Sequence, residues 1–166
     1  MSDNKSDNKS NNNIENKQSE NANISDNSQI LERKNKLKLM RENGIAYPND
    51  FSINTWAEDL IKKYNDCDSE QLEKFSSELS DQGECIKIAG RMMLRRIMGK
   101  AAFFHIQDMT GRIQVYIRKN DLPENQFADF NTWDIGDILG ISGSLFKTKT
   151  GELTIKATDI KLLTKS

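Results

Sequence analysis

The stretch from Gly90 to Ile117, GRMMLRRIMGKAAFFHIQDMTGRIQVYI, constrains the fold of this chain more than any other part of it. Two runs with the composition of β-strands are joined by the turn Gly99-Lys100, and Thr110-Gly111 leads into a third run. Inward and outward residues alternate along the second and third runs, as in strands that bury one face. The stretch therefore predicts three consecutive strands of one sheet.

Three further elements complete the predicted domain. We place strands near 86–98, 101–108, 112–118, 137–147 and 151–162, and a helix near 123–132 with Pro123 in its first turn. Five strands with a helix between the third and the fourth is the order of an OB-fold, whose second and third strands and flanking loops bind oligonucleotides or oligosaccharides. We predict a mainly β fold with some α structure: a five-stranded OB-fold Greek-key barrel preceded by short N-terminal helices and a disordered tail. An unrelated small α+β sheet is the alternative.

The chain before the strands divides into a tail and a helical segment. Residues 1–28 contain nine Asn and six Ser, and a segment of this composition buries too little apolar surface to offset its ordering entropy, so we expect disorder. Residues 29–84 are predicted to be a helical extension, and residues 85–166 the OB-fold domain. Helices are expected at 29–43, from a capping box at Thr55-Trp56-Ala57-Glu58 onward, and at 69–79.

The tail has the features of neither a signal peptide nor a transit peptide, and no apolar run approaches membrane-spanning length. Cys67 and Cys85 are not part of a Cys-x-x-Cys pair and the chain has a single His, which excludes a zinc site of the usual type and fits a reducing compartment. We therefore expect a cytoplasmic protein with no metal and no cofactor bound to this chain.

The net charge of −1 hides an asymmetry between the two halves of the chain. Residues 1–84 carry 11 Lys/Arg and 17 Asp/Glu, a net of −6, whereas residues 85–166 carry 13 and 8, a net of +5. A basic β domain favours a polyanionic partner such as nucleic acid.

Two side chains of the predicted sheet are suited to contact with a nucleotide base. Alternation along the second strand separates Phe103 and His105 from Phe104 and Ile106, and Gln114 lies on the polar side of the third strand. An exposed Phe103 ring can stack on any base, and the Gln114 amide can hydrogen-bond to a base edge. The alternative is that both are exposed residues without a function.

Basic side chains follow these strands and the neighbouring loops. Taken singly, each is a solvated charge, but together they predict a phosphate track whose affinity falls as salt rises. The candidates for this track are Arg91, Arg95, Arg96, Lys100, Arg112, Lys147 and Lys149. Glu152, in the turn sequence KTKTGE, puts a carboxylate beside the basic residues, where it can accept a hydrogen bond from a base, unless it is simply a surface Glu.

No active site is predicted. His105 has no obvious Ser, Cys or carboxylate partner, which favours a structural histidine, and Asp108 is expected to hydrogen-bond the backbone of the following turn. The glycines of Gly140-Ile141-Ser142-Gly143 lie inside a strand pattern, so this segment is neither a dinucleotide loop nor a nucleophile elbow.

Four segments resemble class II lysyl-tRNA synthetases of the bacterial type. They are ENGIAYPNDF (42–51), IAGRMMLRRIMGKAAFFHIQDMTGRIQVYI (88–117), WDIGDILGISGSLFKTKTGELTI (133–155) and LLTKS (162–166). The family's N-terminal OB domain binds the tRNA anticodon. The resemblance implies that Phe103 stacks on the central anticodon base, a uracil, that Gln114 and Arg96 read its edge, and that Glu152 reads a neighbouring base.

The resemblance also implies a lysine tRNA as partner and a homodimer of the kind formed by the full-length family. The helix at 29–43 would pack on the barrel and contact the tRNA or a second subunit. ATP and Mg²⁺ belong to a catalytic domain expected after residue 165, and the class II motifs are absent from this sequence, so we expect the chain alone to be inactive as a lysine–tRNA ligase. It would then be a binding module, or part of a ligase whose remainder lies elsewhere. A general single-stranded nucleic-acid-binding protein without anticodon preference is the alternative function.

Overall fold

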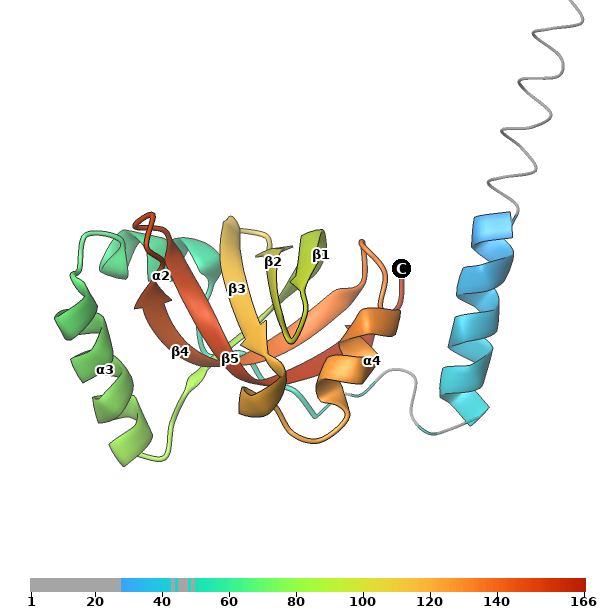
Figure 1. Ribbon diagram of the computed structural model, residues 1–166, viewed down its shortest axis with the longest axis horizontal. Coiled ribbons are helices and arrows are strands. Elements are labelled where there is room, and N and C mark those ends of the chain that lie inside the picture. The colour runs from blue at the N-terminus through green and yellow to red at the C-terminus, as the bar shows by residue number, and fades with distance from the viewer. Residues whose placement is uncertain (1–27, 43, 45–47, 49) are drawn as a thin grey trace, which may run out of the picture. The chain divides into compact units, whose positions relative to one another are not determined.

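The structure is a computed structural model that describes residues 28–42, 44, 48 and 50–166 (Figure 1). The predicted disordered tail lies outside the described residues except for Ser28. Residues 28–42 are helical, close to the predicted 29–43, whose last residue is also outside the described part. The chain divides after residue 45 into two units. The expected contact between this helix and the barrel therefore stays a prediction.

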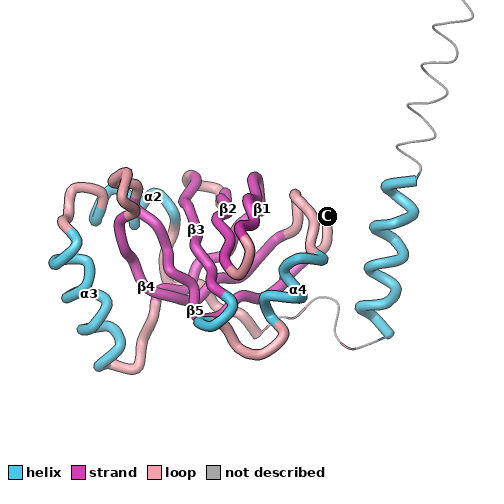
Figure 2. The backbone as a smooth tube through the Cα atoms, in the orientation of Figure 1, coloured by secondary structure: helices cyan, strands magenta, loops and turns pink. Residues whose placement is uncertain are grey.

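Five strands close into a barrel (Figures 1 and 2). The strands are β1 Ile86–Met98, β2 Ala101–Gln107, β3 Arg112–Arg118, β4 Ile138–Lys147 and β5 Leu153–Thr164. Their order around the barrel is β1-β2-β3-β5-β4, and all neighbours are antiparallel except β3 and β5. The predicted fold class is confirmed, and strand positions agree with the sequence pattern to within two residues.

The helix between β3 and β4 is shorter than predicted. A 3₁₀ turn, η1 Lys119–Asp121, follows β3, and α4 spans Gln126–Thr132. Asn125 precedes the helix with a φ of 71°, in the left-handed region. Because this conformation cannot be part of the helix, Pro123 lies before α4 and not in its first turn, which corrects the prediction.

The barrel core consists of the inward residues of the strands and one face of α4. Phe104 on β2 and Phe130 on α4 are fully buried, with ring centroids 4.9 Å apart. Gly143 lies at an irregularity in the β4–β5 pairing, where a Cβ atom would be 2.1 Å from the carbonyl oxygen of Lys156. The glycine in the middle of β4 thus permits close contact between two strands.

Two helices pack in the same unit as the barrel: α2 Ala57–Tyr64 and α3 Ser69–Asp81. The predicted capping box at Thr55 is wrong, because the N-cap residue of α2 is Trp56 and its side chain makes no capping bond. Asp108, in the turn after β2, accepts a hydrogen bond from the Ala57 amide at 2.7 Å. A capping box opens α3 instead, where Asp68 and Gln71 bond reciprocally. The N-terminus of α2 is therefore capped by a residue of the barrel that lies 51 positions later in the sequence.

Candidate nucleic-acid interface

A groove of about 660 Å³ lies on the outer side of the barrel, over β1, β2 and β3 and against the turn between β4 and β5. Its lining includes all four residues proposed for base contacts, Arg96, Phe103, Gln114 and Glu152. Lys147 and Lys149, two members of the predicted phosphate track, line the same groove. Side chains from positions 96 to 152 of the sequence thus meet on one surface.

Strand pairing explains why these side chains share the groove. Phe103 on β2 lies opposite Arg96 on β1 and Tyr116 on β3, while His105 lies opposite Gln114 on β3. The intervening residues of β2 face the core and are fully buried. The predicted separation of Phe103 and His105 from Phe104 and Ile106 is therefore confirmed.

A β-bulge in β1 brings Arg96 to the groove. The pairing with β2 shifts between Met92 and Leu94, which leaves Met93 as the extra residue. Met92 is fully buried, and simple alternation from it would point Arg96 into the barrel. The extra residue reverses the alternation, so Arg96 and its neighbours Leu94 and Met98 line the groove.

Three aromatic rings form a row along the groove. The ring centroids of Phe103 and Tyr116 are 4.8 Å apart, and those of Tyr116 and Phe146 are 5.9 Å apart with an edge-on geometry. Phe103 and Phe146 line the groove and are half-buried. Neighbouring rings hold Phe103 in place while leaving part of its surface open to a stacked base.

A hydrogen-bond network orients the polar groups beside this row. Gln114 Nε2 donates to Glu152 Oε2 at 2.8 Å, and Gln114 Oε1 accepts from the hydroxyl of the buried Thr154 at 2.9 Å. Thr154 lies directly opposite Gln114 in the β3–β5 pairing. The two bonds fix which way round the amide lies. Its nitrogen has a second hydrogen, and we find no acceptor for it in the described part of the chain.

His105 joins the same network, which the sequence did not indicate. Its Nε2 atom is 3.3 Å from Glu152 Oε1, so the expectation that His105 lacks a carboxylate partner is wrong. The turn between β4 and β5 supplies that partner from 47 positions away. The only signal for His105 in the sequence is its two-residue spacing from Phe103.

The predicted phosphate track is only partly assembled at the groove. Lys100 is exposed in the β1–β2 turn and does not line the groove. Arg95 points the other way, since it follows the bulge by two residues and its Nη1 atom donates to the carbonyl oxygens of Phe130 and Trp133. It therefore binds the C-terminal end of α4.

The other two candidates lie farther along the outer face of the strands. Arg91 donates to the carbonyl oxygen of Gly136 at 2.6 Å, and Arg112 donates to Gln107 Oε1 at 3.2 Å. Both are exposed, and Arg91 lines a second hollow next to the groove.

Asp108 has the structural role predicted from its sequence position. Its Oδ1 atom accepts hydrogen bonds from the Thr110 amide and hydroxyl and from the Gly111 amide, at 2.7–2.9 Å. Partial burial acts to raise the pKa of Asp108, but the hydrogen bonds from Ala57, Thr110 and Gly111 outweigh it and the pKa is lowered from its usual value. Its carboxylate therefore stabilises the turn after β2 and the start of α2.

Within the described ranges, the structure contains no group of three or more His, Cys, Asp and Glu side chains placed to hold a metal ion. In those same ranges, no helix has the length and apolar character needed to cross a membrane.

The barrel and the residues before it are similar to parts of known proteins. Residues 86–163 match the anticodon-type OB-fold nucleic acid binding domain family. The lysine–tRNA ligase of Coxiella burnetii is 52% identical over 141 residues, which cover 85% of this chain. Residues 86–163 therefore form an OB-fold domain of the anticodon-binding type, and the chain matches part of the bacterial lysine–tRNA ligases at about 50% identity.

Lysine–tRNA ligases from other bacteria match to a similar degree. The protein of Photorhabdus laumondii is 50% identical and that of Dechloromonas aromatica 49% identical, each over 141 residues and covering 84% and 85% of this chain. The chain spans about 27% of the length of these ligases.

Proposed function

We propose that the groove binds the anticodon of a lysine tRNA, and that this chain is the tRNA-recognition part of a lysine–tRNA ligase. One observation carries the proposal: a half-buried Phe103 ring lines the groove together with an oriented amide, a carboxylate and an arginine. Stacking on Phe103 would contribute about 1–3 kcal/mol whichever base is bound. Selectivity must therefore come from the polar side chains.

The polar side chains offer donors to a central uracil. Gln114 keeps one amide hydrogen for a ligand, and Arg96 lies opposite Phe103 in the strand pairing. Both side chains would donate to carbonyl oxygens of a uracil stacked on Phe103. A cytosine presents an amino group where uracil has an oxygen, so donors would face donors.

Glu152 would read the neighbouring base. Its carboxylate is an acceptor, and the ring N–H of a uracil is a donor at the base edge. The bonds from Gln114 and His105 hold the carboxylate in place in the groove. A sequence of consecutive uracils satisfies this arrangement of donors and acceptor.

Aminoacylation itself, with ATP and Mg²⁺, would belong to the part of the relatives that this chain does not span. Lys147 and Lys149 would hold phosphates at the edge of the groove, with an affinity that falls as salt rises.

The test is fluorescence anisotropy with the stem-loop of a lysine-tRNA anticodon, UUU, against the same loop with a central C, at two salt concentrations. We expect about ten-fold weaker binding to the changed loop. Phe103→Ala should weaken binding of the UUU loop, and Ile135→Ala, at an exposed residue that does not line the groove, serves as the matched control. Equal binding to both loops that responds only to salt would refute anticodon reading and favour a general single-strand binder.

A further inference from the structure

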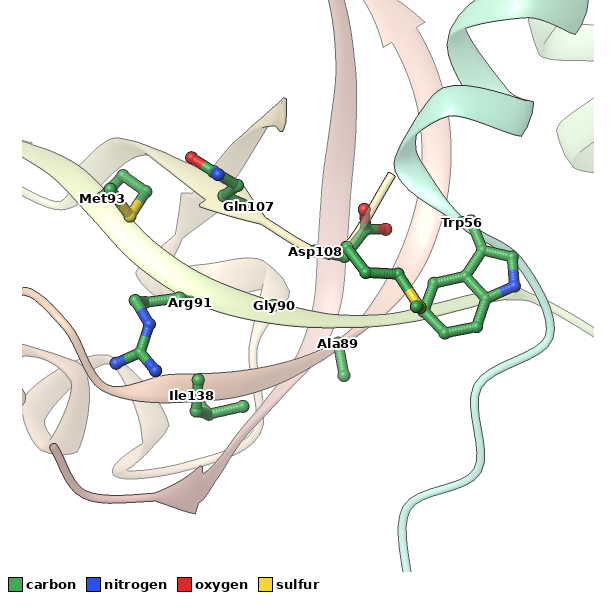
Figure 3. A pocket seen from close by; sticks show the side chains of 9 residues that line it. Trp56, Ala89, Gly90, Arg91, Met93, Gln107, Asp108 and Ile138 are labelled. Carbon is green, nitrogen blue, oxygen red and sulfur yellow. The ribbon is translucent and has the colours of Figure 1, made fainter. Parts of the chain in front are cut away.

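A second hollow, of about 440 Å³, lies next to the groove and is formed by β1, β2, the start of β4 and the residues before α2 (Figure 3). Its lining includes Trp56, Arg91, Met93, Gln107 and Met109. We propose that this hollow is a subsite for a nucleotide that flanks the bases in the groove, so that bound single-stranded RNA follows β2 from Phe103 toward Trp56. The inference rests on the proposed function of the groove.

The groove and the hollow are parts of one surface. Arg91 lies opposite Gln107 on β2 and opposite Ile138 on β4, and Gln107 lies opposite Arg112 on β3. These outward residues lie next to the row that contains His105. Their side chains therefore point to the same side of the sheet as the side chains that line the groove.

The separation of the two hollows requires two different nucleotides. Gln107 follows Phe103 by four residues on the same strand, a distance of about 13 Å along an extended chain. A base stacked on Phe103 cannot also reach Trp56 beyond Gln107. The bulged residue Met93 lies between the hollows along β1, and Figure 3 shows it and Arg91 on the side away from Trp56.

The side chains of the hollow suit a base and its phosphate. The half-buried Trp56 indole provides a flat face, and Met109, with 83% of its surface exposed, provides an adaptable apolar wall. Gln107 Oε1 accepts a hydrogen bond from Arg112 at 3.2 Å, so the amide nitrogen of Gln107 faces away from Arg112 and can donate to a ligand. Arg91 has one nitrogen on the Gly136 carbonyl and further N–H groups for a phosphate.

The single carboxylate in the lining does not oppose this assignment. Both oxygens of Asp108 accept hydrogen bonds from the chain itself, from Ala57, Thr110 and Gly111. The exposed charges on the outward row are the guanidinium groups of Arg91 and Arg112. Their charge and the continuity with a groove rimmed by lysines favour RNA over an apolar protein segment as the occupant.

The experiment uses the full chain and a single-stranded RNA with UUU at its centre and several nucleotides on each side. The fluorescent base 2-aminopurine replaces one flanking nucleotide at a time. We expect its emission to change on binding at one flank, and Trp56→Ala to remove that change and weaken binding about five-fold. Trp56→Phe should keep most of the affinity, because it keeps a flat ring.

Control variants separate this inference from the proposed function. Ile135→Ala removes an apolar side chain that is 51% exposed and lines neither hollow, so it should leave binding unchanged. Met109→Ala tests the same wall as Trp56→Ala without touching the residue that precedes α2. If Phe103→Ala weakens binding but neither Trp56→Ala nor Met109→Ala alters affinity or emission, the subsite is refuted while the groove stands. If Phe103→Ala has no effect, the proposed function itself fails.

Discussion

Two carboxylate networks in the barrel differ in exposure. Asp137 is fully buried and its Oδ2 atom is 2.7 Å from the Lys165 ammonium, which also pairs with Asp134. Glu152 is 47% exposed and accepts from Gln114 and His105. The buried network ties the end of β5 to the loop before β4, whereas the exposed one meets solvent in the groove. The same side-chain chemistry thus holds the fold in one place and is available to a ligand in the other.

The largest expected effect is the loss of the buried pair. Lys165→Ala would leave Asp137 charged and buried without its cation, and we expect the free energy of unfolding to fall by about 3–5 kcal/mol in urea melts. Lys161→Ala is the matched control, because Lys161 pairs with Asp50 at the surface. If both variants lost a similar free energy of unfolding, burial would not explain the difference between the two kinds of network.

Phe103→Ala should act on binding and not on stability. We expect RNA affinity to fall by about 1–3 kcal/mol, because the stacking surface is lost, while the melting temperature changes little. Anisotropy titration and a thermal melt measure the two quantities. A large loss of stability with unchanged affinity would place Phe103 with the core.

Asp108 links the start of α2 to the turn after β2, and its effect on the free energy of unfolding should depend on pH. Because the pKa of Asp108 is lowered in the folded chain, its stabilisation is present above the usual carboxyl pKa and is lost as pH falls through the lowered value. Asp108→Ala should cost about 1 kcal/mol at neutral pH, as for other helix caps, and less in acid. Urea unfolding at several pH values measures this, and a pH-independent cost would contradict the assignment to the carboxylate.

The smallest expected effect on stability is that of Glu152→Gln. The exposed contact with His105 is worth about 0–1 kcal/mol at most. The variant should nevertheless reduce discrimination between U and C at the base beside the central one, measured with matched stem-loops. Unchanged discrimination would remove Glu152 from base reading.

The sequence predicted the strands well because alternation of apolar and polar residues is a local signal. The inward set of β3 and the opposite orientation of Phe103 and Phe104 on β2 followed from it directly. It failed where contacts join distant positions: the cap on α2 comes from Asp108, and the partner of His105 comes from Glu152. The sequence places Arg95 in the phosphate track, because nothing in it marks the bulge that turns this side chain toward α4.

The bulge at Met93 divides β1 into two halves in which opposite sets of positions tolerate substitution. Before it, the positions that share a face with Met92 must fit the core; after it, Leu94, Arg96 and Met98 lie on the outside. Leu94 and Ile97 are exposed although they face opposite ways, and this half of β1 pairs with β2 but not with β4. Deleting a single residue there would change composition and hydrophobicity very little, yet it would turn the residues that line the groove toward the core and the inward residues outward.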